Sequence, residues 1–319
     1  MVQYSRVNDW PIQKSLANNC AKLAEKSDCS NFETVAGYPT RLKNNYGATM
    51  IEPPNDTIAV ELKNNLLTVT LNRPTVLNAL NQDMINALTD VTQQIITDSD
   101  VRVVLLQGAG DNFMAGGDLK SFHEMRKLAP HQATFAKKFE QLVPEAQKPI
   151  RTLRKLRQPV LASVRGSVAG YGLSLMNACD MVIAADDAVF TVAYSRIGAS
   201  PDGGSSWTLP NIIGYRRAFE LMALGDRFDA NTALQFGLIN KLVTVSSFEE
   251  TTAALAQRLL DSPAFAIGNM KQLLGRSSQT ELEKQLSAEE ISFVQCASHP
   301  DFEEGLLAFF EKRTAHFNR

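Results

Sequence analysis

Short apolar runs alternate with longer amphipathic segments from about residue 58 onward. Residues 57–62 and 66–72 alternate apolar and polar positions on either side of Asn64 and Asn65, which predicts a β-hairpin. Residues 101–107 form a continuous apolar run, which is typical of a strand buried on both faces. The same pattern predicts short strands at residues 159–164, 181–185 and 189–192.

In the segments between these strands, apolar residues recur at helical spacing. Asn81 is placed to cap a helix whose apolar stripe contains Met84, Leu88, Val91 and Ile95. A short apolar helix is predicted at residues 172–179. Strands that alternate with helices predict an α/β fold with a mainly parallel sheet.

Two further regions have helical character. Residues 118–157 are charged and helical in tendency, and we expect breaks at Pro130, Pro144 and Pro149. Beyond residue 203 the chain is predicted to be mostly helical. Asp301 is the expected cap of a last helix, with apolar positions at Leu306, Leu307, Phe309 and Phe310.

The first part of the chain differs from the rest. Ile12, Leu16, Cys20 and Leu23 recur at helical spacing, so a short amphipathic helix is predicted over residues 12–26, followed by a linker through residues 52–56. We therefore divide the chain into an N-terminal extension, a core and a C-terminal helical region, at residues 1–57, 58–255 and 256–319.

Composition restricts the class of protein. The chain has 319 residues, of which 44% are hydrophobic and 21% charged, with a net charge of −2. These values fit a globular protein and give no overall attraction to nucleic acid. No apolar run has the length of a membrane span, and we expect no membrane partner. The chain shows no secretory or organelle address, and its four cysteines lack a CxxC pair, so we expect a cytoplasmic protein. A disulfide bond between Cys20 and Cys29 is an alternative that the sequence leaves undecided.

Two glycine-rich turns carry the candidate chemistry. Residues 160–174 run from an apolar strand through a loop with three glycines into a helix, and residues 113–120 hold a second glycine turn after another strand. Free N–H groups at a helix start can hold a developing oxyanion, and the helix dipole adds positive potential. The alternatives are turns with a purely structural role, or a dinucleotide-binding turn at Gly108 and Gly110. The latter is disfavoured because Phe113 replaces its third glycine.

Several motifs in order along residues 58–319 support a family assignment. They include Asn72-Arg73-Pro74, Ala115-Gly116-Gly117-Asp118, Gly166 through Gly172, Pro201-Asp202-Gly203-Gly204 and Phe309-Phe310-Glu311-Lys312-Arg313. In this order they resemble the crotonase, or enoyl-CoA hydratase/isomerase, superfamily. The resemblance implies a spiral of ββα units with a C-terminal helical trimerisation region. It also implies an acyl-CoA thioester as substrate and a homotrimer or a dimer of trimers.

The resemblance also implies roles for individual residues. The backbone N–H groups of Gly117 and Tyr171 would form an oxyanion hole for a thioester enolate. Positions near coenzyme A would be Lys120, Ala115, Thr75 and Leu77, with Phe309 and Lys312 covering the adenine side, often from a neighbouring subunit. Many family members carry Lys or Arg where this chain has Thr75. Asp118 would brace the first loop.

The chain departs from the family at its two usual catalytic glutamates. Ser174 and Tyr194 occupy those positions, and neither is a carboxylate. Addition of water needs an acid and a base, so two-glutamate hydration is disfavoured. Asp202 instead resembles the single base of crotonase-type isomerases. Its alternative role is that of a turn or cap residue. Tyr194 would contact the acyl group, orient Asp202 or be a buried structural tyrosine, and Ser174 would fill space.

The most favoured function is therefore an enoyl-CoA isomerase that moves a double bond with Asp202. The alternatives are a hydratase, a hydrolase or a C–C bond enzyme of the same superfamily, or a non-catalytic acyl-CoA-binding homologue. The histidines are His123, His131, His299 and His316, and they lack metal-ligand spacing. We expect no metal and no cofactor, since coenzyme A is part of the substrate.

Overall fold

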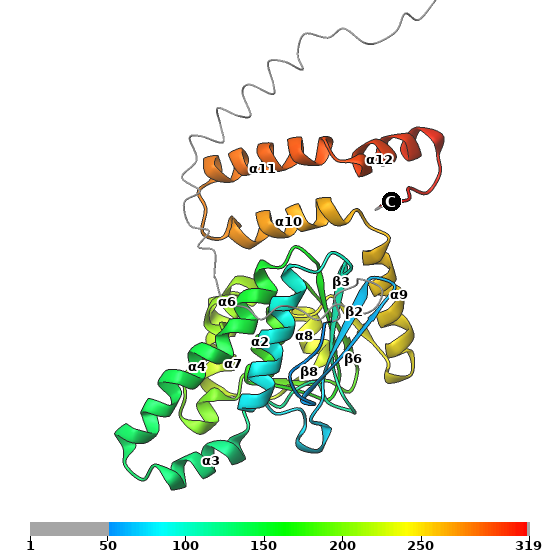
Figure 1. Cartoon of the computed structure of the whole chain (residues 1–319). Coiled ribbons are helices and arrows are strands. Elements are labelled where there is room, and N and C mark those ends of the chain that lie inside the picture. Colours follow the sequence, from blue (N-terminus) through cyan, green and yellow to red (C-terminus); the bar gives the residue numbers. More distant parts are fainter. Residues whose placement is uncertain (1–50, 318–319) are drawn as a thin grey trace, which may run out of the picture. The chain divides into compact units, whose positions relative to one another are not determined.

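A β-hairpin begins the sheet in the computed structural model, which describes residues 51–317 (Figure 1). Strands β1 (Ile58–Lys63) and β2 (Leu66–Leu71) pair antiparallel. Asn64 and Asn65 have φ values of 50° and 65°, in the left-handed region that a tight hairpin turn needs and that asparagine tolerates. The predicted hairpin is confirmed, whereas the predicted helix at residues 12–26 lies outside the described residues.

The main sheet is mostly parallel, as predicted. Within residues 51–317 its order is β1-β2-β3-β4-β6-β9, and every pairing after the hairpin is parallel. The added strands are β3 (Val103–Gly108), β4 (Val160–Val164), β6 (Met181–Ala185) and β9 (Lys241–Val243). A second, smaller sheet holds β5 (Ser167–Ala169), β7 (Val189–Thr191) and β8 (Phe228–Asp229).

Helices cover both faces of the main sheet, which explains the continuous apolar runs of β3 and β4. Alternate residues such as Leu105 and Leu161 pack with Phe248 of α9 (Phe248–Leu260) on one face. Their neighbours Val104 and Ala162 belong to the larger core on the other face, which includes α2 (Gln82–Ile96). Because a strand turns successive side chains to opposite faces, both sets of positions must be apolar.

Helix α2 begins and packs as predicted. The Oδ1 of Asn81 accepts a 3.0 Å hydrogen bond from the N–H of Met84, which satisfies one free donor of the first turn. The predicted stripe of Met84, Leu88, Val91 and Ile95 is buried. The described end of the predicted linker lies against this helix, since Glu52 exchanges hydrogen bonds with the side chain of Gln94.

The prediction of breaks at Pro144 and Pro149 is wrong. Both residues lie inside α4 (Gln132–Lys155), and the break comes only at Pro130, between α3 (Leu119–Leu128) and α4. A proline within a helix costs about 3 kcal/mol. Helix α4 tolerates that cost because it buries a face against the core, which includes the residues Ala146, Pro149, Ile150, Thr152 and Leu153.

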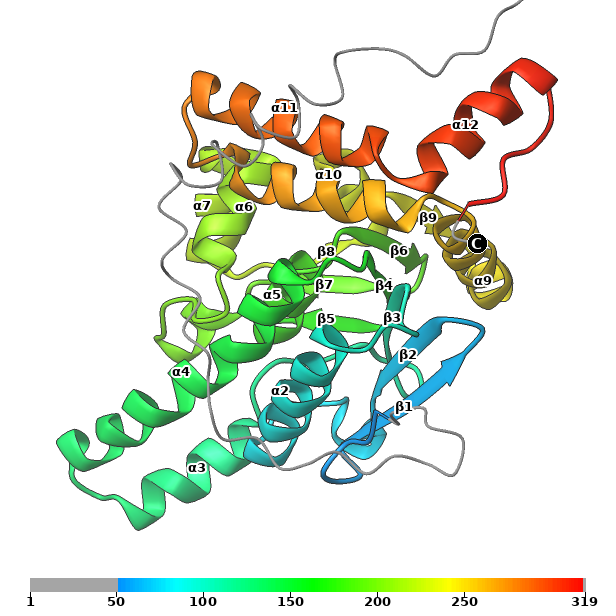
Figure 2. The same ribbon diagram turned by 45° about the horizontal axis from the view of Figure 1, so that its top comes forward.

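The second half of the described chain is mostly helical, as predicted. Helix α5 (Tyr171–Asn177) follows β5, and α6 (Ser205–Ile213), α7 (Tyr215–Leu224) and α8 (Ala230–Phe236) come after residue 203. Short 3-10 turns are η1 (Pro74–Val76), which precedes α2, η2 (Tyr194–Ile197) and η3 (Val245–Ser247). The last helices are α10 (Ala264–Ser277), α11 (Leu282–Ala297) and α12 (Pro300–Glu311), which form a separate layer (Figure 2).

The residue predicted to cap the last helix is wrong by two positions. His299, not Asp301, caps α12, because its Nδ1 accepts a 3.2 Å hydrogen bond from the N–H of Asp301. Pro300 occupies the first helical position, where its fixed φ suits a helix start, so the chain enters the helix before Asp301. Asp301 lies in the first turn, where a negative charge suits the helix dipole.

A buried lysine attaches the C-terminal layer to the core. The Nζ of Lys271 on α10 lies 2.7 Å from Oδ2 of Asp180 and donates to the carbonyl oxygens of Leu153 and Gln158, each at 3.0 Å. These contacts satisfy all three donors of the ammonium group. The predicted boundary at residue 255 falls inside α9, and the division into domains stays a prediction. No helix in residues 51–317 is long and apolar enough to cross a membrane.

Candidate active site

The two glycine turns lie in direct contact. The N–H of Met114 donates to the carbonyl of Ser167 and the carbonyl of Met114 accepts from Ala169, each at 2.9 Å, so the first loop extends the edge of β5. Gly116 has a φ of 96°, and a Cβ atom there would lie 3.0 Å from the carbonyl oxygen of Ala169 and 3.6 Å from Cα of Gly170. Only glycine allows this approach of the two chains.

The N–H groups of Gly117 and Tyr171 follow this contact on the two loops. On either side of Gly117, the carbonyl of Gly116 accepts from Leu80 at 2.8 Å and the N–H of Asp118 donates to Leu80 at 2.9 Å. Tyr171 is the first residue of α5, where N–H groups lack helical partners. Neither N–H donates to another group within residues 51–317. Both are therefore free to bind an oxyanion.

Asp118 holds the first loop in place. Its Oδ1 accepts from the N–H of Ser121 at 3.2 Å, and its Oδ2 lies 3.0 Å from the guanidinium of Arg73, which also bonds the carbonyl of Ala79. Burial raises the pKa of Asp118, but the bonds from Ser121 and Arg73 lower it more, so the pKa of this carboxyl lies below 3.8. A carboxylate that stays ionised at neutral pH is poorly suited to proton transfer.

Asp202 reaches the site because its loop packs tightly on α5. A Cβ atom on the next residue, Gly203, would lie 2.5 Å from Cβ of Ser174 and 3.3 Å from the ring of Tyr171. The backbone carbonyl of Asp202 accepts a 3.0 Å hydrogen bond from Nε2 of Gln147 on α4. The structure thus brings Asp202 beside the start of α5, which carries the free N–H of Tyr171.

Tyr194 bonds directly to Asp202. Its Oη donates a 2.6 Å hydrogen bond to Oδ1 of Asp202. Burial and the Asp202 carboxylate raise the pKa of Tyr194 well above its ordinary value, so the hydroxyl stays protonated at neutral pH. Among the roles that the sequence leaves open for Tyr194, this geometry fits the orientation of Asp202.

Ser174 is enclosed. It is 1% exposed, and its Oγ lies 2.7 Å from Oγ of Ser205 and 3.4 Å from Oη of Tyr194. The hydroxyl of Tyr171 donates to the carbonyl of Ala146 at 2.5 Å and so fixes α5 against α4. Burial, with Asp202 and Tyr194 nearby, raises the pKa of Tyr171. Gly203 also packs closely on Ser174, since a Cβ atom on Gly203 would lie 2.9 Å from Oγ of Ser174.

Aromatic rings form a wall beside Gly117. The ring of Phe122 lies 3.1 Å from the position of a Cβ on Gly117, and it meets Phe139 edge to face at a centroid distance of 5.2 Å. Phe135 adds a second edge-to-face contact with Phe139 at 5.2 Å. All three rings are half-buried. Together they offer an apolar surface next to a free N–H group.

The predicted coenzyme A positions fall into two groups. Leu77 and Ala115 lie together, because the N–H of Ala115 donates to the carbonyl of Leu77 at 3.0 Å, and Thr75 and Lys120 are exposed on η1 and at the start of α3. Phe309 and Lys312, by contrast, are exposed at the end of α12, which lies at the opposite end of the described chain from α3 (Figures 1 and 2). One chain does not bring the two groups together.

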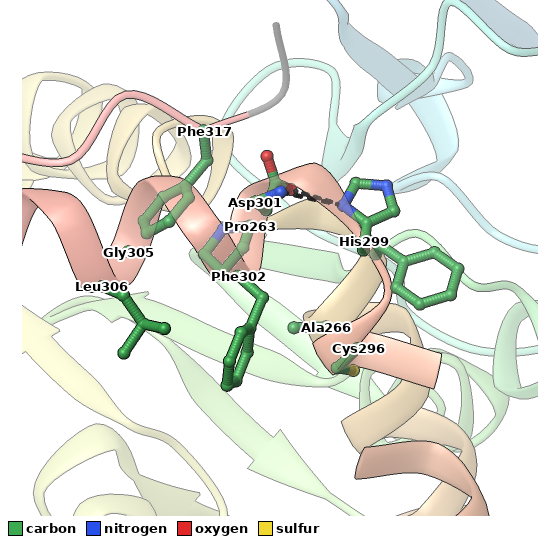
Figure 3. A pocket seen from close by; sticks show the side chains of 10 residues that line it. Pro263, Ala266, Cys296, His299, Asp301, Phe302, Gly305, Leu306 and Phe317 are labelled. Atoms are coloured by element: carbon green, nitrogen blue, oxygen red, sulfur yellow. Dashed lines mark hydrogen bonds and ion pairs between the residues drawn. The ribbon is translucent and has the colours of Figure 1, made fainter. Parts of the chain in front are cut away.

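Neither a metal cluster nor the cavity of the C-terminal layer contributes to this site. Within residues 51–317, no group of three or more His, Cys, Asp or Glu residues could hold a metal ion. A cavity of about 260 Å³ lies among α10, α11 and α12, with Phe302, Leu306 and Phe317 on its walls (Figure 3). It contains none of the candidate site residues, and we regard it as a gap in helix packing.

Sequence reasoning did not identify Ser205, Gln147 or Phe122. Ser205 directly follows the Pro201-Asp202-Gly203-Gly204 motif at the start of an apolar helix, and this position next to the motif is a signal that could have found it. Gln147 and Phe122 lie in the charged segment of residues 118–157, where no pattern distinguishes them from surface residues. Only the packing of α3 and α4 places them beside the glycine loops.

The chain is similar to acyl-CoA enzymes over most of its length. Residues 61–319 match the family model described as enoyl-CoA hydratase/isomerase. A 1,2-epoxyphenylacetyl-CoA isomerase of Escherichia coli is 34% identical over 261 residues, which cover 82% of this chain and 97% of that protein. A short-chain-enoyl-CoA hydratase of Clostridium acetobutylicum is 32% identical, with 80% of this chain and 95% of that protein covered.

A solved structure agrees with these matches. The crystal structure of an enoyl-CoA hydratase from Polaromonas sp. JS666 superposes with a TM-score of 0.76 and 32% identity, covering 82% of this chain and 99% of that chain. The fold predicted from the motifs is thereby confirmed. The relatives include both an isomerase and hydratases, so similarity alone does not choose between the two reactions.

Proposed function

The chain belongs to the enoyl-CoA hydratase/isomerase family, and from that premise we propose that it is an isomerase that shifts a double bond of an acyl-CoA with Asp202 as its one base. The observation that carries the proposal is the arrangement around Asp202. A single carboxylate lies beside the start of α5, whereas the two positions expected to hold glutamates in a hydratase hold Ser174 and Tyr194, which bond to each other or to Asp202.

The proposed reaction moves one proton. Asp202 takes a proton from C2 of a 3-enoyl thioester, and the electron pair of that C–H bond passes into the thioester carbonyl to form an enolate. The N–H groups of Gly117 and Tyr171 hold the enolate oxygen. Asp202 then returns the proton to C4, the carbonyl re-forms, and the double bond lies between C2 and C3. No water is consumed and no group besides Asp202 needs to change its protonation state.

The packing of Ser174 disfavours hydration. A water molecule that attacks C3 needs a base close to it, and in a two-glutamate hydratase one glutamate would project from position 174. Here the side chain at position 174 is enclosed, since Ser174 is 1% exposed and its hydroxyl lies 2.7 Å from that of Ser205. The site therefore has Asp202 but no carboxylate at position 174.

The acyl group is proposed to lie along the aromatic wall of Phe122, Phe135 and Phe139. This wall adjoins Gly117 and therefore the carbons next to the thioester. Lys120 and the backbone around Leu77 are proposed to contact the coenzyme A part of the substrate, because they lie at the exposed outer end of the same loops. Lysine is a suitable partner for its phosphates.

A self-association through the C-terminal layer fits this assignment. Large apolar side chains on α10, α11 and α12 are exposed in the single chain, among them Leu274 at 74%, Phe293 at 66% and Phe310 at 77%. Exposed apolar surface of this extent on adjacent helices is typical of an interface. We propose a homotrimer or a dimer of trimers in which Phe309 and Lys312 approach the coenzyme A of a neighbouring copy, and light scattering of the full chain tests it.

Product identity tests the proposed reaction. Purified full-length protein is incubated with a 3-enoyl-CoA and, separately, with the matching 2-enoyl-CoA, and products are followed by absorbance and mass spectrometry. The proposal predicts formation of the conjugated 2-enoyl-CoA at unchanged mass. A gain of one water would favour a hydratase, release of free coenzyme A would favour a hydrolase, and binding of both esters without turnover would favour a non-catalytic role.

A further inference from the structure

A row of buried hydroxyl groups leads away from Asp202. Oγ of Ser205 lies 2.7 Å from Oγ of Ser174, which lies 3.4 Å from Oη of Tyr194, which lies 2.6 Å from Oδ1 of Asp202. We propose that these groups form one directed hydrogen-bond chain that positions the Asp202 carboxylate and sets its basicity. The inference rests on the proposed function only in taking Asp202 as the base.

The carboxylate fixes the direction of the chain. An ionised Asp202 has no proton to give, so the hydroxyl of Tyr194 must donate to it. The oxygen of Tyr194 is then left as an acceptor, and the hydroxyl of Ser174 is its nearby donor. Since Ser174 has a single proton, its own oxygen accepts from Ser205. Every proton in the row therefore points toward Asp202.

One group competes with this arrangement. Oγ of Ser174 also lies 3.4 Å from the carbonyl of Gly170, the ordinary partner of a helical serine. That carbonyl already accepts the N–H of Ser174 at 3.1 Å. The oxygen of Tyr194, in contrast, has no other donor within residues 51–317. Donation to Tyr194 therefore satisfies a group that would otherwise lack a partner.

Burial strengthens the hydrogen bonds of this row. Ser205 is fully buried, Ser174 is 1% exposed and Tyr194 is 9% exposed. In a site with little water, neighbouring hydrogen bonds polarise and strengthen one another. The three residues come from α6, α5 and η2, so the row also ties three elements to the loop that carries Asp202.

Few other groups act on the Asp202 carboxylate. On α5, Tyr171 lies close enough to interact electrostatically with Asp202, but its hydroxyl donates to Ala146. On α4, Gln147 binds only the backbone of Asp202. The guanidinium of Arg151 donates to Oε1 of Gln147 at 2.7 Å. Within residues 51–317, Tyr194 is thus the side-chain donor to Oδ1 of Asp202, which leaves Oδ2 for the substrate.

The test uses proton exchange at C2, which does not require the natural acyl group. Full-length protein is incubated in D₂O with phenylacetyl-CoA, which has no double bond to migrate, and deuterium uptake at C2 is measured by mass spectrometry from about pH 5 to about pH 9. The variants are Tyr194→Phe, Ser174→Ala and Ser205→Ala. The matched control is Ser163→Ala, because Ser163 also loses a buried hydroxyl partner, Thr252 at 3.1 Å, but lies in β4 outside the site.

The expected result is a graded shift. Tyr194→Phe removes a bond to the charged carboxylate and moves the acid limb of the exchange profile to higher pH by about one unit. Ser174→Ala shifts it in the same direction by roughly 10–30% of that amount, and Ser205→Ala shifts it less. Ser205→Thr keeps the hydroxyl and restores the wild-type limb. A purely structural role would lower the rate without moving the limb.

Different results would refute the hydrogen-bond chain and the proposed function. The hydrogen-bond chain would be refuted if the acid limb did not move in Tyr194→Phe, or if the serine variants behaved like Ser163→Ala. Exchange by the wild type would still support Asp202 as the base. Absence of both exchange and isomerisation in the wild type would overturn the proposed function. The hydrogen-bond chain can then still be tested by the ¹³Cζ resonance of Tyr194, which is identified by its loss in Tyr194→Phe. This resonance must shift in Ser174→Ala, and an unchanged resonance would refute the hydrogen-bond chain.

Discussion

Tyr194 and Asp202 share a 2.6 Å hydrogen bond in which the tyrosine hydroxyl donates to the carboxylate. Tyr194 stands where the resemblance to two-glutamate hydratases leads one to expect an acid. In this chain that position instead supports a carboxylate carried by another loop. The bond converts two separate motif departures, Ser174 and Tyr194, into parts of one arrangement around Asp202.

We expect Asp202→Asn to abolish isomerisation. An amide cannot take the C2 proton, and the loss of a general base lowers rates by about 100- to 10,000-fold. Binding of a saturated acyl-CoA, measured by calorimetry, should be nearly unchanged. Asp90→Asn, at an exposed site on α2, is the charge-matched control. Wild-type turnover in Asp202→Asn would exclude Asp202 as the base.

Gly203→Ala should displace Asp202 and lower both activity and stability. The added methyl would lie 2.5 Å from Cβ of Ser174, so the loop or α5 must move. Overpacking of this kind costs about 1–3 kcal/mol. The control is Gly275→Ala on α10, where a Cβ meets open space and alanine favours the helix. Thermal unfolding and isomerase assays measure both effects, and equal behaviour of the two variants would contradict the packing argument.

Ser174→Glu should not create a hydratase. A glutamate at this enclosed position has neither space beside Gly203 nor a basic partner, and burial of an unpaired carboxylate costs several kcal/mol. We expect a protein that unfolds at lower temperature and adds no water to crotonyl-CoA. Ser174→Ala is the comparison, because it removes the hydroxyl without adding volume. Appearance of hydrated product in Ser174→Glu would show that the loop can yield.

Phe122→Leu should weaken binding of aromatic acyl groups selectively. Leucine keeps most of the apolar area beside Gly117 but loses the ring with which a phenyl group of the substrate would pair. Aromatic pairs contribute about 0.5–1.5 kcal/mol beyond burial, which corresponds to about a 2- to 12-fold weaker binding of phenylacetyl-CoA. Calorimetry with hexanoyl-CoA should show little change. Equal losses for both esters would mean that the wall acts by area alone.

Asp118→Asn should remove a pH-dependent contribution to stability. The pKa of Asp118 is lower in the folded protein than its ordinary 3.8, so its ionised form is favoured by folding. That contribution is present above the unfolded-state value and disappears as the pH falls through the folded-state value. The melting temperatures of wild type and variant should therefore differ near neutral pH and converge in acid. A difference that persists at the lowest pH would assign the effect to packing instead.

Local patterns predicted the fold well where a single signal dominates. The turn at Asn64 and Asn65, the Asn81 cap and the doubly buried strands all depend on residues close together in the chain. The prolines of α4 misled the prediction, because the gain from burying Ile150 and Leu153 depends on distant elements. His299 replaced Asp301 as a cap since an imidazole nitrogen also accepts a hydrogen bond.

The site was predictable in its parts but not in its connections. Motifs named Gly117, Tyr171 and Asp202, whose positions follow from loops with distinctive composition. The bond between Tyr194 and Asp202 depends on how the loop at Gly203 packs on α5, and no pattern in the sequence measures that distance. Ser205 became visible for the same reason, through its 2.7 Å contact with Ser174.

The contact between Gly116 and Gly170 has a consequence for how such a site can change over evolutionary time. The proposed oxyanion donors are main-chain N–H groups, so only proline would remove one directly, and the close approach at Gly116 disfavours a side chain there. Changes of chemistry therefore fall on Ser174, Tyr194 and Asp202, whose functional groups are side chains. A lineage can change the reaction by substitution at these three positions while the proposed main-chain binding site for a thioester oxygen stays the same.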